Sequence, residues 1–287
     1  MTAPQITVVG SVNLDLVARA ETLPVAGETV TGATFAQHPG GKGANQALAA
    51  RRLGADGSMI ARVGRDANAE AALALLKRDG VDLFGIVEDE DDATGVALIA
   101  VDAQGENQIV VASGANANLS ASDVRKTSAC DAVLCQLEVP VAAVMAASDI
   151  ETSLFAINLA PAMPAPIGLL ERADLLIVNE VEAAFYGDNL HRGDGLVALT
   201  LGGAGAVLYR SGKELVHMPV FSVPVVDTTG AGDTFCGALV LALAEGQDPG
   251  EALRFASAAG ALAVTKEGAQ PSLPTREEVE AFLKTQG

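Results

Sequence analysis

The segment DTTGAGDTF, residues 227–235, places small residues and two aspartates directly before an apolar stretch. Gly230, Ala231 and Gly232 permit a tight turn whose N–H groups point into one concavity. A helix that begins at this turn adds the positive end of its dipole. The combination suits a negative group such as a transferring phosphoryl, and Asp233 could take the proton of an attacking hydroxyl. Taken alone, the segment is equally consistent with a simple turn in which Asp233 is a helix N-cap.

Two stretches nearer the N-terminus carry groups that suit sugar hydroxyls. In HPGGKGANQALAARRLGA, residues 38–55, glycines precede a predicted helix on which the amide of Asn45 can both donate and accept. In GSVNLDLV, residues 10–17, Asn13 and Asp15 alternate with apolar residues, so they face one side of an extended strand. A helix-capping loop and a solvated strand face are the structural alternatives.

A further polar pair follows a predicted strand in VNEVEA, residues 178–183. Asn179 and Glu182 share a helix face if a helix starts here, and such a pair can hold water around Mg²⁺ near phosphates. The same spacing fits a capping box, with Asn179 as the N-cap. Both interpretations can hold together.

The elements that would position these groups follow an α/β pattern. Strands are predicted at 6–11, 132–137, 154–158, 175–179, 196–201 and 206–210, and helices at 43–55, 68–80, 140–148, 231–245, 249–264 and 275–284. Strands that alternate with helices predict a mostly parallel sheet with helices on its faces. Two segments, 14–38 and 94–113, consist of short alternating runs instead, and we interpret them as a small β lid inserted twice from the main domain.

The composition limits the classes of partner. The chain has 287 residues, 49% of them hydrophobic, and a net charge of −18, so its acidic surface would repel nucleic acid. No apolar run reaches the roughly 18 residues of a membrane helix, and the N-terminus lacks a secretory pattern. Three cysteines without CxxC spacing indicate buried thiols rather than a disulfide framework or a zinc site. We therefore expect a cytoplasmic protein with no membrane and no nucleic-acid partner.

Taken together, these segments resemble the ribokinase-type carbohydrate kinases, the PfkB family, over nearly the whole chain. GGKGANQALAARRLGA is similar to the family's N-terminal signature and DTTGAGDTF to its C-terminal signature. The segments GVALI, GEN, SGAN, QLE and KEGAQPSLP are most similar to the ribokinase branch of the family. The resemblance implies a three-layer αβα domain, formed by residues 1–12, 39–93 and 114–287, and a β-sheet lid formed by 13–38 and 94–113.

The resemblance also implies roles for single residues. Asp233 would be the general base, and the anion hole for the γ-phosphoryl group would be Gly230, Ala231 and Gly232. The sugar would contact Asn13, Asp15, Gly41, Lys42, Gly43, Asn45 and Glu138, together with Ala97 and Ile99 on the lid. The nucleotide side would be formed by Asn179, Glu182, Thr200, Gly202, Gly205 and Gly232. A monovalent-cation site, partly built from backbone carbonyls, would use Asp227, Thr229, Ala263, Lys266, Gly268 and Ser272.

The activity that the resemblance implies is ATP-dependent phosphorylation of D-ribose at O5, with Mg²⁺, with K⁺ as an activator, and in a homodimer formed through the lids. A kinase of another sugar or of a nucleoside is one alternative, and a non-catalytic sugar-binding protein on the same fold is another. The sequence departs from the ribokinase pattern in two places. NLAPAM, residues 158–163, replaces the usual NPAP, and the connection from Glu182 to Leu196 lacks room for a helix that ribokinases usually place there.

Overall fold

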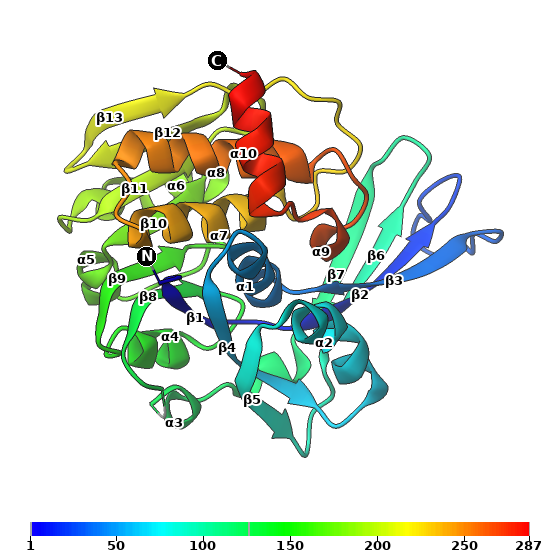
Figure 1. Cartoon of the computed structure of the whole chain (residues 1–287). Coiled ribbons are helices and arrows are strands. Elements are labelled where there is room, and N and C mark those ends of the chain that lie inside the picture. The colour runs from blue at the N-terminus through cyan, green and yellow to red at the C-terminus, as the bar shows by residue number, and fades with distance from the viewer. Residues whose placement is uncertain (1, 126, 287) are drawn as a thin grey trace.

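The computed structural model of the protein describes residues 2–125 and 127–286 and has a nine-stranded sheet at its centre (Figure 1). In spatial order the strands are β13 (Lys213–Met218), β12 (Ala206–Arg210), β11 (Leu196–Thr200), β10 (Leu175–Asn179), β9 (Thr152–Asn158), β8 (Cys130–Gln136), β1 (Gln5–Val9), β4 (Asp56–Gly64) and β5 (Asp82–Asp89). Neighbours from β11 to β5 pair in parallel, whereas β12 is antiparallel to both β11 and β13. The predicted mostly parallel sheet is confirmed.

The two faces of this sheet bury two separate hydrophobic cores, which gives the three-layer arrangement. One face is covered by α1 (Lys42–Arg52), α2 (Ala67–Asp79), α7 (Ala231–Ala244), α8 (Pro249–Ala263) and α10 (Arg276–Thr285). The other is covered by α3 (Ala121–Val124), α4 (Val141–Ala147), α5 (Ile167–Arg172) and α6 (Glu180–Tyr186). Along β8, Leu134 belongs to the first core and Val133 and Cys135 to the second, as expected for a parallel strand buried on both faces.

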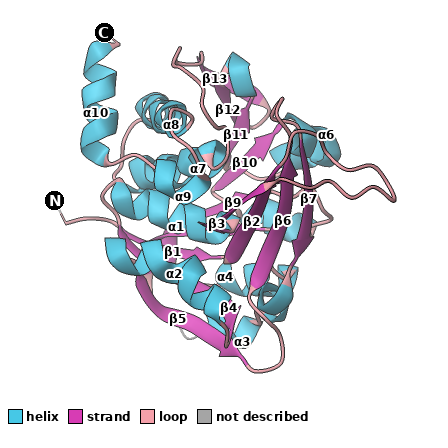
Figure 2. Ribbon diagram, turned by 90° about the vertical axis from the view of Figure 1, so that its right-hand side faces the viewer, coloured by secondary structure: helices cyan, strands magenta, loops and turns pink. Residues whose placement is uncertain are grey.

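A smaller four-stranded sheet projects from one side of this body, and Figure 2 shows it nearly face on. Its order is β3 (Thr34–Gly40), β2 (Asn13–Arg19), β6 (Gly95–Val101) and β7 (Asn107–Ala112). Only Gly10, Ser11 and Val12 separate the end of β1 from the start of β2. The smaller sheet is therefore a direct continuation of the carboxyl end of a central strand.

Several predicted elements differ from the observed ones. The strand predicted at 6–11 ends at Val9, the helix predicted to reach residue 55 ends at Arg52, and residues 27–33 lie in a loop rather than in a strand. Three strands were not predicted at all: β4, β5 and β13. In β4, polar Ser58 and Arg62 interrupt the apolar run. Each has a partner on another element: Ser58 forms a hydrogen bond with Thr7, and Arg62 forms ion pairs with Asp89 and Asp123.

None of the described helices is long and apolar enough to cross a bilayer.

The short connection noted in the sequence is completed by one 3₁₀ turn, η2 (Gly187–His191), between α6 and β11. Tyr186 and Leu190 reach back into the second core, so this short link still covers part of the sheet. Two further 3₁₀ turns, η1 (Gly114–Asn118) and η3 (Gly202–Ala204), and the short helix α9 (Ala269–Ser272) complete the described elements.

Candidate active site

The predicted functional residues gather where the parallel strands end and two helices begin. Glu138 follows β8, Asn179 ends β10 and Thr200 ends β11, while Lys42 begins α1 and Ala231 begins α7. The carboxyl ends of parallel strands share one edge of a sheet, where α/β proteins usually bind ligands. The smaller sheet starts at the same edge, through β1 and β2.

Asp233 lies in the first turn of α7 and is held by two amides from α1. Asn45 Nδ2 donates to its Oδ2 at 2.8 Å, and Gln46 Nε2 donates to its Oδ1 at 2.9 Å. Burial raises the pKa of Asp233, while the positive charge of Lys42 and the two amide donors oppose that rise. Asn45 Oδ1 is buried and accepts from no group within residues 2–125 and 127–286, so it remains available to a ligand hydroxyl.

The turn before α7 offers free N–H groups. Gly230 adopts a left-handed conformation with φ of 79°, and within the described part of the chain no side chain caps this helix start. Ala231 N donates to Thr228 O and Thr234 N to Gly230 O, so the N–H groups of Gly232 and Asp233 point out of the helix end. A Cβ built on Gly232 meets no atom within 4 Å, which leaves open space in front of the turn. The turn can receive a negative group, as the glycine pattern predicts.

Glu138 joins the end of β8 to the start of α1. Its Oε2 accepts from Ser11 Oγ at 2.6 Å and from the backbone N–H of Lys42 at 3.1 Å. Its Oε1 lies 3.9 Å from Lys42 Nζ. Although burial lowers it, the pKa of Lys42 is raised overall by the negative charges of Asp233 and Glu138, which keeps this ammonium group charged.

The predicted sugar-binding residues of β2 lie beside the two segments that leave the main domain. Asn13 Oδ1 accepts from Asn116 Nδ2 at 2.8 Å, so the Asn13 amide nitrogen faces away from that contact. Asp15 lies so close to Gly40 that a Cβ there would overlap its carboxylate. Burial, followed by the charges of Glu138 and Asp233, raises the pKa of Asp15 to about 6.

On the neighbouring strand β6, Ala97 pairs with Asp15 and Ile99 with Val17, so both face the same side as Asn13 and Asp15. Two glycines let α1 approach this junction. Gly41 has φ of 89°, and a Cβ there would lie 2.7 Å from Asn13 N; a Cβ on Gly43 would lie 2.6 Å from Ser11 N. The close backbone approach brings the α1 residues and the β2 residues to one place.

Asn179 and Glu182 form the capping box at the start of α6. Glu182 N donates to Asn179 Oδ1 at 3.0 Å, and Asn179 N donates to Glu182 Oε2 at 2.8 Å. Glu182 is 6% exposed, and burial raises its pKa. Both side chains are thus occupied locally, and they fit a Mg²⁺ ion held through water better than one bound directly. Thr200, which pairs with Asn179, ends β11. Gly202 begins η3 and Gly205 follows it, and both have positive φ.

The residues assigned to a monovalent-cation site lie on the segment before α7 and on the segment from the end of α8 to the end of α9. Asp227 Oδ1 accepts from Thr229 N and Oγ1, and its Oδ2 accepts from Gly268 N, at 2.9, 2.6 and 2.9 Å. Ala263 ends α8, and buried Ser272 donates to Ala269 O. The Lys266 side chain points to Glu278 instead, so only its backbone carbonyl could serve such a site. Among the described residues, no three His, Cys, Asp or Glu side chains group as a metal site.

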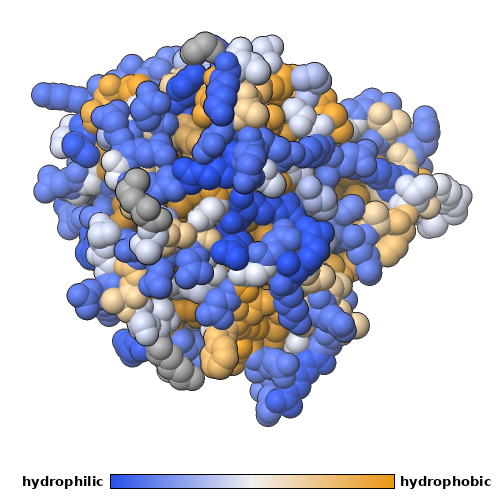
Figure 3. Space-filling view, viewed as in Figure 1, coloured by the Kyte–Doolittle hydropathy of each residue, from blue (hydrophilic) through white to orange (hydrophobic). Residues whose placement is uncertain are grey.

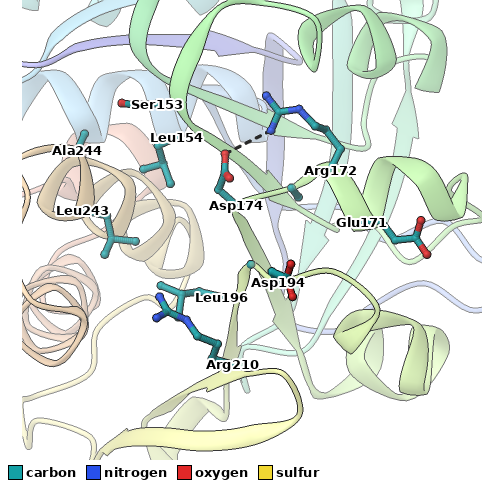
Figure 4. A pocket seen from close by; sticks show the side chains of 12 residues that line it. Ser153, Leu154, Glu171, Arg172, Asp174, Asp194, Leu196, Arg210, Leu243 and Ala244 are labelled. Atoms are coloured by element: carbon teal, nitrogen blue, oxygen red, sulfur yellow. Dashed lines mark hydrogen bonds and ion pairs between the residues drawn. The ribbon is translucent and has the colours of Figure 1, made fainter.

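A surface cavity of about 530 Å³ lies at the opposite edge of the sheet and contains none of the predicted site residues (Figure 4). Leu196 and Leu154, near the amino ends of β11 and β9, line it together with Leu243 at the end of α7. Arg172 pairs with Asp174 at 3.4 Å on its rim. This cavity lies at the amino ends of the strands, away from the catalytic edge.

Three residues of the site were given no role from the sequence: Ser11, Gln46 and Asn116. Gln46 was visible as the polar residue after Asn45 on an otherwise apolar helix face, and it is completely buried. Asn116 is the last residue of SGAN, a segment that is similar to the ribokinase branch but that gave no role to this side chain. Their partners are far away along the chain, and no local pattern identifies such contacts.

A large αβα sheet with a small β sheet at its catalytic edge, and a carboxylate at a Gly-rich helix start, define a kinase of the carbohydrate type. The sequence model of the pfkB family carbohydrate kinases matches residues 3–276, and the chain belongs to this family. The chain is 41% identical to a ribokinase of Bacillus subtilis over 294 residues, covering 97% of this chain and 99% of that protein.

Solved structures agree with this assignment. A ribokinase from Thermotoga maritima superposes with a TM-score of 0.90 at 34% identity, covering 98% of this chain and 99% of the other. A ribokinase of Arabidopsis thaliana complexed with ribose and ATP superposes with a TM-score of 0.87 at 31% identity, covering 99% of each chain. The match spans both sheets, including the smaller one.

Proposed function

We propose that this protein transfers the γ-phosphoryl group of ATP to O5 of D-ribose. The observation that carries the proposal is the position of Asp233, whose carboxylate is fixed by Asn45 and Gln46 at the helix start where the N–H groups of Gly232 and Asp233 point outward. The N–H of Ala231, which the sequence also assigned to the anion hole, donates to Thr228 O instead. The similarity to ribokinases, one of which is complexed with ribose and ATP, supports the choice of both substrates.

In the proposed reaction, Asp233 accepts the proton of the 5-hydroxyl as that oxygen bonds to the γ-phosphorus and the bond from phosphorus to the ADP oxygen breaks. The N–H groups at the start of α7 then lie against the phosphoryl oxygens and stabilise their charge. Lys42, close to both Asp233 and Glu138, supplies the nearby cationic side chain. The acidic protein thus holds an anionic group with backbone dipoles and few cations.

The sugar would lie between α1 and the smaller sheet. Asp15, Glu138 Oε1 and Asn45 Oδ1 are acceptors for its hydroxyls, and the Asn13 amide nitrogen is a donor. Gly41, Lys42 and Gly43 bring the backbone close, and Ala97 and Ile99 supply apolar contact from β6. We propose that the smaller sheet acts as a lid that excludes water from the reacting atoms.

The nucleotide would approach from the β10 and β11 side. Asn179 and Glu182 would hold the water shell of Mg²⁺, which neutralises phosphate charge when it is bound. Thr200, Gly202 and Gly205 would form the turn that contacts the nucleotide. Gly232 would contact the γ-phosphoryl group through its N–H.

We infer that a K⁺ ion orders the turn before α7. Asp227 already ties this turn to the Gly268 loop, and the further ligands would be backbone carbonyls of Thr229, Ala263, Lys266 and Gly268, with the Ser272 hydroxyl. The donor set, mostly neutral oxygens with one carboxylate, suits a large monovalent cation. Binding there would fix the N–H groups that face the phosphoryl group.

We infer a homodimer formed through the smaller sheets. Phe35, Leu98 and Val110 lie on one face of that sheet and are 65%, 50% and 65% exposed. In Figure 3 apolar residues are visible on the projecting sheet, as they are at several places on the main body. A second copy would cover these side chains and the exposed edges of the smaller sheet.

We also infer a cytoplasmic location, because the three cysteines are free thiols and the proposed reaction uses ATP.

The test is a coupled ADP-release assay on D-ribose, 2-deoxyribose, fructose and a nucleoside panel, with K⁺ or with Na⁺ at equal ionic strength. The proposal predicts the highest kcat/KM on D-ribose and faster turnover with K⁺. Preference for another acceptor would keep the chemistry and replace the substrate. Ribose binding without turnover on any acceptor would indicate the non-catalytic alternative.

A further inference from the structure

A chain of buried amides leads from the central strands to the carboxylate of Asp233. Gln46 Nε2 donates to Asp233 Oδ1 at 2.9 Å and to Asn158 Oδ1 at 3.1 Å, and Gln136 Nε2 donates to Gln46 Oε1 at 2.7 Å. Gln46 and Gln136 are 0% exposed, and Asn158 is 8% exposed. These side chains come from α1, β8 and β9, so three elements converge on one oxygen of Asp233.

The hydrogen bonds fix which way each amide points. Gln136 donates to the Gln46 oxygen, so the Gln46 NH₂ group must face the other way, toward Asp233 and Asn158. Asn158 Nδ2 donates to the backbone oxygen of Ile177 at 3.2 Å, which turns the Asn158 oxygen toward Gln46. Gln136 Oε1 occupies the space that a Cβ on Gly10 would fill, and it accepts from no group among the described residues, so the bond to Gln46 is what sets the direction of the Gln136 amide. The network has one consistent direction, and a flipped Gln46 would lose all three bonds.

The chemistry at Gln46 requires a neutral donor that is also an acceptor. A carboxylate there would accept only and would repel Asp233, and an apolar side chain would leave the Gln136 nitrogen and the Asp233 and Asn158 oxygens without this partner. The second oxygen of Asp233 is held differently. Asn45, its donor, has a free Oδ1 and lies in the predicted sugar site, so its amide can respond to the ligand. Gln46 is thus the fixed contact of the two.

We propose that Gln46, oriented by Gln136 and Asn158, is a positioning residue that holds Asp233 Oδ1 in place and maintains the ionised base that receives the hydroxyl proton. This inference rests on the proposed kinase function. It assigns the fixed orientation of the base to the main domain, because every member of the network lies on α1, β8, β9 or α7 and none lies on the smaller sheet.

The test compares three near-isosteric variants with the wild type. Gln46→Met removes the donor to Asp233, and Gln136→Met leaves that donor but releases its orientation. Thr7→Val is the matched control, since the buried Thr7 makes a different, part-buried side-chain hydrogen bond, that to Ser58, in the middle of β1. The readouts are the pH dependence of kcat with D-ribose and the titration of the Asp233 carboxyl carbon by ¹³C NMR, assigned with Asp233→Asn.

For Gln46→Met we expect the acid limb of the kcat profile and the Asp233 titration to move upward by about one to two pH units, because a charge-assisted hydrogen bond to the ionised form is lost. KM for ribose should change little. Gln136→Met should show a smaller shift of the same sign, and Thr7→Val should show none.

The inference is overturned if folded Gln46→Met keeps the wild-type acid limb and Asp233 titration, or if Thr7→Val shifts them equally. If Gln46→Met does not fold, the test depends on Gln136→Met. An Asp233 titration in that variant equal to that of the wild type would contradict the orienting role of Gln136. A wild type without turnover on any acceptor would instead contradict the proposed function, while the NMR titration would still test the contact.

Discussion

Four carboxylates, those of Asp15, Glu138, Glu182 and Asp233, interact electrostatically with the ammonium group of Lys42. Three of them, Asp15, Glu138 and Asp233, differ in the groups that contact them. Burial and the negative charges of two nearby acids, Glu138 and Asp233, raise the pKa of Asp15 to about 6. Asp233 is also affected by burial, but two amide donors and Lys42 oppose the effect. Glu138 accepts from Ser11 and from the start of α1. The assignment of one of these acids as base therefore follows from its contacts rather than from its residue type.

The raised pKa of Asp15 makes a prediction about stability without ligand. An acid whose pKa is higher in the folded state favours folding at low pH, and this contribution is lost as pH rises from about 4 to about 6. Asp15→Asn should therefore be more stable than the wild type at pH 7.5, by up to about 3 kcal/mol, and should show little difference near pH 4. Urea unfolding of both proteins at the two pH values measures this. An equal difference at both values would contradict the raised pKa.

Asp233→Asn tests the base itself. The new amide can keep its oxygen toward Gln46, while its NH₂ group meets Asn45, whose amide is free to turn because its own oxygen has no partner within the described residues. We therefore expect ribose affinity within a few-fold of the wild type by calorimetry, and kcat lower by about 100- to 10,000-fold. Turnover close to that of the wild type would show that another group takes the proton.

At the scale of the element, the junction between the two sheets depends on one side chain of η1. Asn116 accepts from Val12 N at 2.9 Å and donates to Val12 O at 3.0 Å and to Asn13 Oδ1 at 2.8 Å. It lies just after β7, so it ties the exit of the smaller sheet to its entry at β2. The same contact orients Asn13 for the sugar.

Asn116→Ala should therefore weaken both the junction and sugar binding. It leaves two buried backbone groups of Val12 without this partner, and we expect a loss of about 2–4 kcal/mol in the free energy of unfolding. KM for ribose should rise by at least tenfold, and KM for ATP should stay near the wild-type value. Asn118→Ala, in the same turn but bonded to Asp89 and Asp92, is the control. Equal effects on both KM values would contradict a role specific to the sugar side.

The elements differ in how well the sequence predicted them. The strands β8 to β12 are apolar runs bounded by turns, and each was predicted close to its observed bounds. β4 was missed because Arg62 and Ser58 interrupt it, and their partners Asp89, Asp123 and Thr7 become visible only in three dimensions. Gln46 is similar: its partners Gln136 and Asn158 are 90 and 112 residues away. Local pattern predicts what a segment can form, whereas a buried polar residue takes its role from tertiary contacts.

At the scale of the whole molecule, the chain combines a net charge of −18 with an anionic substrate. The general field of such a protein opposes ATP, and the free N–H groups at the start of α7 provide a local exception. The predicted cations act at the same edge of the sheet. The local N–H groups at the start of α7, rather than the overall charge of the protein, make the site suitable for phosphate.

The proposed homodimer predicts how a charge on the smaller sheet changes the oligomeric state of the protein. Leu98→Glu places a charge among Phe35, Leu98 and Val110, and we expect it to convert a wild-type dimer into a monomer in sedimentation velocity at micromolar concentration. Phe84→Glu, at a 99% exposed position on the edge strand β5, is the control and should leave the dimer intact. A monomeric wild type, or dissociation by the control alone, would contradict an interface on the smaller sheet.

The position of the phosphoryl group in the product tests most directly whether this protein phosphorylates O5 of D-ribose with Asp233 as the base. The protein would be incubated with ATP, Mg²⁺, K⁺ and D-ribose, and the product would be examined by ¹H–³¹P correlation NMR beside an Asp233→Asn reaction. We expect a single phosphomonoester whose phosphorus correlates with the two protons on C5, and none from the variant. A phosphorus correlated with the proton on C1, or the same product formed equally fast by the variant, would contradict it.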